Sequence, residues 1–242
     1  VGAVLVLVIV DWARLQQAFF QPEIMRDMFP EVITIRVKNT IVYTALAFSA
    51  GLILALVLAL MRRSSIPMYR WAAIGYIELF RGLPALITLI LVAFGLPIAL
   101  GISVPGGIAG KGTLGLGLVA GAYMAETIRA GIEAVPRGQM EAARSLGMTK
   151  GKAMLYIILP QAFRIIIPPL TNELVLLIKD TSLLFVIGTT PLSKELTKFA
   201  RDFMTSTQNA TPLTVVAILY LVITLPLTFL VRRLEKKAGQ GR

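Results

Sequence analysis

The chain of 242 residues contains no cysteine and no histidine, and only 15% of its residues are charged. Without cysteine, a disulfide framework and a thiolate metal site are excluded. Without histidine, the chain cannot supply a histidine-based catalytic triad or histidine metal ligands. No motif supports a site built from carboxylates alone, so we predict no metal site.

Hydrophobic residues are abundant instead. They make up 56% of the chain, and the mean hydropathy is +0.78. A soluble core in so short a chain could not bury this much apolar surface. A bilayer accepts apolar helices of ~20 residues. We therefore expect an all-α polytopic protein with the lipid bilayer as its surroundings.

Five apolar runs are long enough to be predicted as spans: residues 39–61, 71–100, 112–135, 159–187 and 212–231. The second run contains Pro84 and Pro97. In the third run, Gly115, Gly117 and Ala120 imitate a dinucleotide fingerprint, but no strand precedes them. Small residues inside a span favour close helix packing instead.

The two ends of the chain are less regular. Residues 1–10 are apolar but too short to span a bilayer, and we interpret them as the end of a truncated helix. A signal-peptide remnant is the alternative. Residues 11–38 are mixed in polarity and indicate an interfacial loop or a short helix.

The formal net charge of +11 could suggest a nucleic-acid partner. However, the basic residues lie between the apolar runs rather than in one patch, so we expect no nucleic acid. More of them fall on the side of Arg62, Arg63 and the C-terminus. The positive-inside rule assigns that side to the cytosol. Residues 194–202 are then external.

Residues 137–156 interrupt the apolar pattern with charges spaced among alanine, leucine and methionine. This pattern predicts an amphipathic helical hairpin on the cytosolic side. We place Glu141 in the first turn of a short helix, where the helix dipole favours a carboxylate. Ala142 and Ala143 are small enough for another surface to approach, and Gly147 permits a sharp turn. A loop lying on lipid headgroups is the alternative.

The segment Glu141-Ala142-Ala143, with Gly147 and Pro160 behind it, resembles the EAA loop of ABC importer permeases. Residues 76–84, 126–133 and 179–183 resemble the polar amino-acid branch of that family. The resemblance covers the chain from about residue 32 onward. It implies a type I importer permease fold with about five core transmembrane helices behind a truncated N-terminal helix. Residues 1–38 would comprise the truncated helix and an external segment. Residues 39–242 would form the permease domain, with the cytosolic coupling hairpin at residues 137–156.

The resemblance also implies partners and roles. A second permease subunit, the same or a similar chain, would complete the pore. Two cytosolic ATPase subunits would hold ATP and Mg²⁺, so this chain would carry no cofactor and catalyse nothing. An extracytoplasmic solute-binding protein would deliver an amino acid at a bacterial inner membrane. ATPase coupling would fall to Glu141, Ala142, Ala143 and Gly147.

Three other functions stay open. The chain could be an ABC permease for another small polar solute. It could be a channel or passive pore, although a channel would not need the hairpin. It could also be a membrane-embedded hydrolase, which would need groups such as Asp180, Ser182 and Lys179.

Charged residues inside the spans cost at least ~2.5 kcal/mol each at the bilayer centre, so they face partners or a polar path. Spacing of three residues predicts two helical ion pairs, Glu78 with Arg81 and Glu126 with Arg129. The predicted solute path is centred on Glu173, which lies ~13 Å along the helix from Arg164. Pro168 and Pro169 would break the helix beside it. The full predicted path is Asn172, Glu173, Lys179, Asp180, Thr181 and Ser182.

Overall fold

The computed structural model describes residues 11–239, which fold into helices without strands. The truncated helix predicted at residues 1–10 lies outside the described residues. The helices are α2 (Trp12–Phe19), α3 (Pro22–Met28), the π-helical η1 (Val32–Val37), α4 (Lys38–Arg62), α5 (Pro67–Gly82), α6 (Ala85–Ile90), the π-helical η2 (Leu91–Gly95), α7 (Leu96–Leu100), α8 (Gly107–Glu133), α9 (Arg137–Ser145), α10 (Lys150–Ala153), the π-helical η3 (Met154–Ile158), α11 (Leu159–Asp180), the 3-10 helices η4 (Thr181–Ile187) and η5 (Pro191–Ser193), α12 (Leu196–Thr207) and α13 (Thr211–Gly239).

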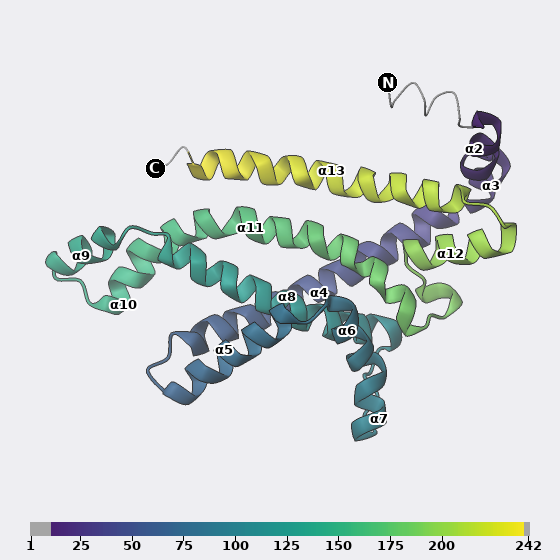
Figure 1. The fold of residues 1–242 in the computed structure, drawn as a ribbon. Coiled ribbons are helices and arrows are strands. Elements are labelled where there is room, and N and C mark those ends of the chain that lie inside the picture. The colour runs from purple at the N-terminus through teal and green to yellow at the C-terminus, as the bar shows by residue number, and fades with distance from the viewer. Residues whose placement is uncertain (1–10, 240–242) are drawn as a thin grey trace.

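Three helical runs within residues 11–239 are long and apolar enough to cross a membrane: Val32–Arg62, Lys150–Ile187 and Thr211–Lys237. A fourth crossing exists if α5 and the helix that follows it count as one bent span. The glycine-rich α8, predicted as another span, runs through the middle of the bundle (Figure 1). The prediction of an all-α polytopic protein is confirmed.

The span predicted at residues 71–100 is wrong as a single helix. It breaks after α5, and the two parts meet at an angle of 107°. Leu83 leaves the helical conformation with φ −89° and ψ 137°. The residue before a proline is sterically driven out of the α region, and Pro84 follows it directly. Pro97, by contrast, lies inside the continuous helical run Ala85–Leu100, which tolerates the lost backbone donor.

The break predicted at Pro168 and Pro169 does not occur, because both prolines lie inside the continuous helix α11. Each proline removes one backbone donor, and neighbouring packing lets a membrane helix tolerate the loss. Pro168 is buried in this helix. The second arm of the predicted hairpin is likewise not separate, since α10 and η3 lead directly into α11. The connection between α7 and α8 is short, because α8 begins at Gly107.

The α4–α8 interface confirms the packing predicted for the small residues. A Cβ atom on Gly117 would lie 3.4 Å from both Ala47 O and Ala50 Cβ. On Gly121, it would lie 2.8 Å from Leu54 Cδ2. Without side chains at these points the two helices approach closely, which is how membrane helices gain contact energy.

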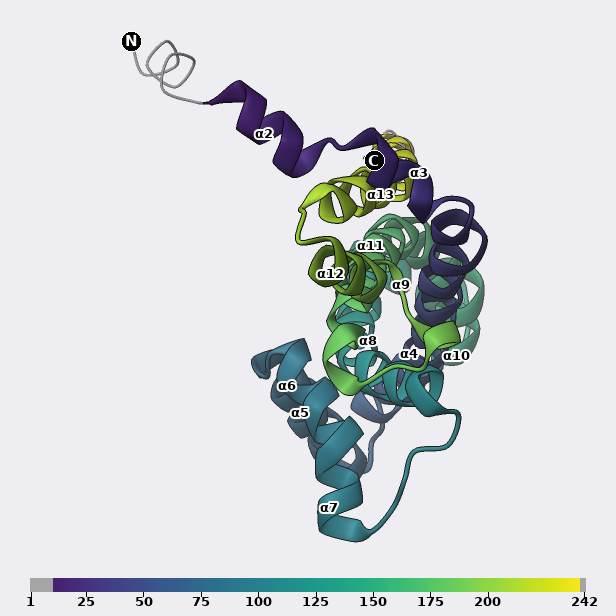
Figure 2. The same ribbon diagram turned by 90° about the vertical axis from the view of Figure 1, so that its right-hand side faces the viewer.

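The bundle has two distinct ends. The α9–α10 hairpin and the end of α13 lie at one end (Figure 1). At the opposite end, α2, α3 and α12 gather (Figures 1 and 2). A separate apolar cluster joins α3, η1, α12 and α13 there through residues that include Met28, Val32, Leu196 and Val215. The grouping agrees with the predicted topology, in which the hairpin and the C-terminus share the cytosolic side.

Candidate functional site

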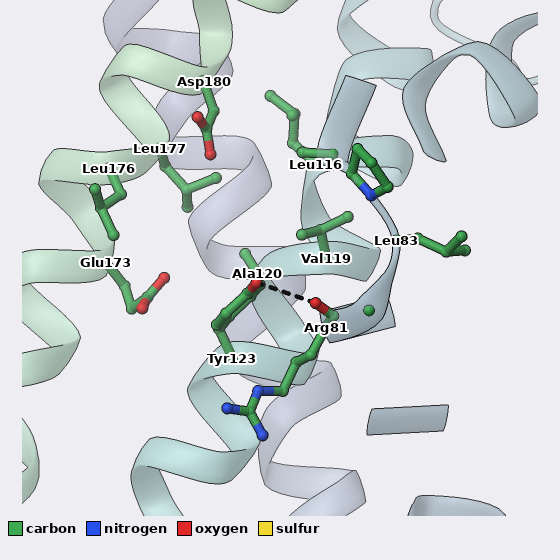
Figure 3. Close-up of a pocket in the computed structure, with 13 residues that line it drawn as sticks. Arg81, Leu83, Leu116, Val119, Ala120, Tyr123, Glu173, Leu176, Leu177 and Asp180 are labelled. Atoms are coloured by element: carbon green, nitrogen blue, oxygen red, sulfur yellow. Dashed lines mark hydrogen bonds between the residues drawn. The ribbon is translucent and has the colours of Figure 1, made fainter. Parts of the chain in front are cut away.

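A cavity of about 510 Å³ opens where α5 breaks from α6, opposite α8 and α11 (Figure 3). Apolar residues make up most of its wall. Four polar side chains also line it: Arg81 from α5, Tyr123 from α8, and Glu173 and Asp180 from α11. The break after α5 lies across the cavity from Glu173, and it is not the break predicted at Pro168 and Pro169, which does not occur.

Both carboxylates reach the cavity because of helical spacing. Glu173, Leu177 and Asp180 are separated by four and three residues and share one face of α11. Figure 3 shows both carboxylates directed toward the space between α11 and α8.

The other residues of the predicted path do not line this cavity in the described part of the chain. Asn172 and Lys179 are exposed on a different face of α11. Thr181 is buried, and its hydroxyl donates to the carbonyl of Ile178 at 2.6 Å. Ser182 follows in η4 and is half-buried. Residues 179–182 therefore mark the change from α to 3-10 helix.

The predicted pair of Glu78 and Arg81 does not form. Glu78 is exposed, and the guanidinium of Arg81 lies 5.6 Å from the ring centroid of Tyr123 instead. The Tyr123 hydroxyl donates to the Arg81 carbonyl at 3.3 Å. Arg81 lies in the last turn of α5, where its side chain reaches the neighbouring helix. Sequence reasoning missed Arg81 and Tyr123 as cavity residues, although Arg81 directly precedes Gly82-Leu83-Pro84.

The cavity therefore offers charges of both signs inside an otherwise apolar wall. Its volume falls within the range of sites that bind small molecules, roughly 300–1,000 Å³. A guanidinium binds carboxylates well. Carboxylates bind ammonium groups, and these interactions are stronger in a low-dielectric surrounding than in water. The arrangement suits a small zwitterion.

The predicted pair of Glu126 and Arg129 is confirmed and belongs to a larger network. Arg129 Nε donates to Glu126 Oε2 at 3.0 Å, and Arg62 Nη1 from α4 donates to the same oxygen at 2.9 Å. Arg129 also contacts Glu133. None of these residues lines the cavity at the α5–α6 break. The network instead links α4 to α8 through ion pairs.

The first arm of the hairpin ends in a Schellman motif. The backbone N–H of Gly147 donates to Arg144 O at 3.0 Å, and that of Met148 donates to Ala143 O at 3.1 Å. Gly147 has φ +83°, as the predicted sharp turn requires. Arg144 Nη1 donates to Met148 O at 2.9 Å and closes the turn further.

The outer surface of α9 differs from the expectation in two respects. Ala143 is buried within the chain at 4% exposure, so of the two alanines Ala142 alone faces outward. Glu141 lies in the second turn, because α9 begins at Arg137, and the dipole effect fades after the first turn. Sequence reasoning missed Leu146, which is 85% exposed beside Gly147.

The sequence profile of the family described as "Binding-protein-dependent transport system inner membrane component" matches residues 48–240. The chain belongs to this family. It is therefore a multi-pass permease subunit that transports and does not itself catalyse a reaction. Membership implies ATPase and solute-binding partners.

Two relatives come from Bacillus subtilis (strain 168). The probable glutamine ABC transporter permease protein GlnM is 38% identical over 201 residues, covering 82% of this permease and 89% of the relative. The arginine transport system permease protein ArtQ is 39% identical over 188 residues, covering 77% and 83%. A crystal structure of an amino acid ABC transporter with histidines matches with a TM-score of 0.80 and 38% identity, covering 88% and 96%. These matches confirm the type I importer permease fold.

Proposed function

We propose that the permease carries polar amino acids and that the cavity at the α5–α6 break is on their path. The observation that carries the proposal is that Arg81, Glu173 and Asp180 line the same cavity of about 510 Å³. It is supported by relatives named for glutamine and arginine transport.

In this proposal, Arg81 binds the α-carboxylate of the solute. Glu173 and Asp180 bind its ammonium group, and the apolar wall accommodates the aliphatic part. The broken helix contributes free backbone groups at the end of α5 and the start of α6. Such interrupted helices form solute sites in other transporter folds.

The remaining parts follow from the two ends of the bundle. The transporter has two ATPase subunits, with ATP and Mg²⁺, and one of them docks on Glu141, Ala142, Gly147 and the exposed Leu146 of this chain. Ala143 supports this surface from beneath. A second permease subunit completes the pore, and an extracytoplasmic solute-binding protein docks at the α2–α12 end. ATP binding and hydrolysis move the helices between outward-open and inward-open states in a bacterial inner membrane.

The test is uptake by the assembled transporter in proteoliposomes, with competition by an amino acid and by its carboxamide. The wild type should bind the free amino acid and reject the amide, which lacks the carboxylate. Arg81→Gln should raise the KM at least tenfold and lose this discrimination, because a charge-assisted hydrogen bond contributes about 1.5–3 kcal/mol. Arg70→Gln removes the same charge from an exposed position on α5 and should behave as the wild type.

If Arg81→Gln keeps full discrimination, the cavity is not the site of carboxylate recognition. If no amino acid is taken up but another small polar solute is, the alternative ABC permease function is correct. ATP-independent uptake would favour a channel.

A further inference from the structure

A second cavity, of about 480 Å³, lies at the hairpin end of the bundle, where α4 and α8 end and α9 begins. Its wall is apolar toward the bundle. Ile132, Val135, Met140, Met154 and Ile158 form that part. Arg63, Glu133 and Arg137 form the charged part of the lining. An apolar wall beside basic side chains is an amphipathic arrangement.

The charges around this cavity do not balance. Glu133 is engaged by Arg129, and Glu126 is engaged by Arg129 and Arg62. Within the described chain, no salt bridge involves Arg63 or Arg137. Two guanidinium groups are therefore left to face an anion. Arg137 is also the first residue of α9, so the positive end of the helix dipole adds to their field.

The location makes a lipid the fitting anion. The membrane-crossing run Val32–Arg62 ends beside the cavity, and the neighbouring α8 ends there too. Spanning helices end near the level at which phospholipid phosphates meet acyl chains, so a lipid can reach a cavity placed there. A free phosphate would use the guanidinium groups but leave the apolar wall unoccupied, whereas a phospholipid uses both. Basic pockets between membrane helices bind anionic headgroups on this principle.

We propose that this cavity binds an anionic phospholipid, with Arg63 and Arg137 on the headgroup phosphate and an acyl chain against Met140 and Met154. Met140 lies on α9, so the bound lipid supports the hairpin from its membrane side. The exposed Glu141, Ala142 and Leu146 stay free for the ATPase subunit. The site is separate from the solute cavity and does not depend on which solute is carried.

The test uses the assembled transporter, purified in detergent and loaded with phosphatidylglycerol or phosphatidylcholine. Native mass spectrometry counts the retained lipids. We expect preferential retention of phosphatidylglycerol, reduced about thirtyfold in the double variant Arg63→Gln, Arg137→Gln, since two basic residues near a membrane surface together contribute ~2 kcal/mol. The control variant Arg233→Gln, Lys236→Gln removes two charges from the end of α13 and should retain the lipid. A second variant, Met154→Trp, fills the apolar wall and should lose the lipid with both arginines intact.

Four results would overturn the proposal. Equal losses in the arginine variant and the α13 control would mean general surface attraction. Equal retention of phosphatidylcholine would mean that the charge is irrelevant. Displacement by inorganic phosphate, with Met154→Trp unchanged, would identify a simple anion site. Loss of the ATPase subunit from the arginine variant, with the lipid kept, would assign the cavity to the docking surface.

Discussion

Glu173 and Asp180 enter one cavity because they lie seven residues apart on α11, two full helical turns. Asn172 and Lys179 are also seven residues apart, but one position earlier, and their side chains are exposed on another face. At this scale, one position along the helix separates a solute-facing group from a surface group. The same geometry gives a sharp contrast between neighbouring variants.

We predict that Glu173→Gln lowers the affinity for the solute at least tenfold, because the amide cannot provide a negative charge for the ammonium group. Asn172→Ala should leave transport near the wild-type level, since that side chain does not line the cavity. The measurement is the KM and maximal rate of uptake in proteoliposomes, with the assembled complex quantified by size-exclusion chromatography. Unchanged kinetics in Glu173→Gln would make that residue structural.

Gly147 has a second single-residue role, at the end of α9. Its φ of +83° lies in the left-handed region, where a side chain costs about 1–2 kcal/mol. A Cβ at this position would meet no atom within 4 Å. The cost of substitution is therefore in the backbone conformation rather than in packing.

We predict that Gly147→Asp inserts into the membrane normally but loses ATP-driven uptake, because the strained turn and the added charge weaken docking of the ATPase. Gly138→Asp is the control: it lies in α9, also without contacts for a Cβ, but lacks a positive φ. Co-purification of the ATPase subunit and uptake are the readouts. The docking hypothesis fails if Gly147→Asp holds its ATPase as tightly as the control does.

At the scale of the elements, contact between α4 and α8 depends on the absence of side chains. A Cβ on Gly51 would lie 2.8 Å from Met124 Cε and 3.1 Å from Gly117 O. Gly121 meets the facing helix in the same way. The Arg62–Glu126 contact holds the same two helices together nearer the hairpin end.

We predict that Gly121→Leu lowers the melting temperature of the detergent-purified complex by several degrees, because it overpacks this interface at a cost of about 1–3 kcal/mol. Gly75→Leu on the exposed face of α5 has open space around its Cβ and should not lower it. Thermal unfolding monitored by fluorescence provides the comparison. An equal decrease in both variants would contradict close packing as the cause.

A second element, the strap of residues 190–195, is held against the first long helix at the α12 end. Arg36 Nη1 donates to Pro191 O at 2.8 Å. Asn39 Nδ2 donates to Leu192 O at 2.8 Å and to Lys194 O at 2.9 Å, and Tyr43 Oη donates to Ser193 O at 2.9 Å. The strap ends at Glu195, a fully buried carboxylate that accepts from the backbone N–H groups of residues 197 and 198.

Burial raises the pKa of Glu195 to about 7 from its ordinary value of 4.5, despite these hydrogen bonds. The folded state thus binds the proton more tightly than the opened state does. The stabilising contribution of protonated Glu195 is complete below pH 4.5 and is lost as pH rises toward 7. We predict that the protection of residues 190–198 against hydrogen exchange, corrected for intrinsic rates, falls at least tenfold over that window.

The Glu195→Gln variant tests the cause, because glutamine keeps an acceptor for the helix cap but does not titrate. Its protection should be independent of pH. If the variant shows the same fall as the wild type, Glu195 is not the responsible group.

At the scale of the whole molecule, the distribution of charge sets the orientation. Arg62 ends α4, and Arg63, directly after it, lines a cavity together with residues of the hairpin. The basic end of α13 lies at the same end of the bundle (Figure 1). The strap and α12 lie at the opposite end. The positive-inside rule therefore assigns the hairpin to the cytosol and the strap to the exterior.

We predict that a membrane-impermeant maleimide added to intact cells labels Leu192→Cys but not Arg233→Cys. Leu192 is 75% exposed on the strap, and the parent chain has no cysteine to give a background. Disruption of the cells should then make Arg233→Cys reactive. The opposite pattern would invert the orientation.

The sequence by itself determined the features that depend on local chemistry. Apolar runs specify membrane helices, the basic residues predict their orientation, and Gly147 specifies the turn after α9. Spacing along one helix predicted the pair of Glu126 and Arg129, because both partners lie on α8. Only the tertiary structure decided which groups meet across helices. Arg81 does not pair with Glu78 on its own helix but contacts Tyr123, because α5 packs against α8. The prolines show the same limit: Pro84 breaks its helix, while Pro168 and Pro169 do not, because surrounding packing determines whether the lost hydrogen bonds can be tolerated.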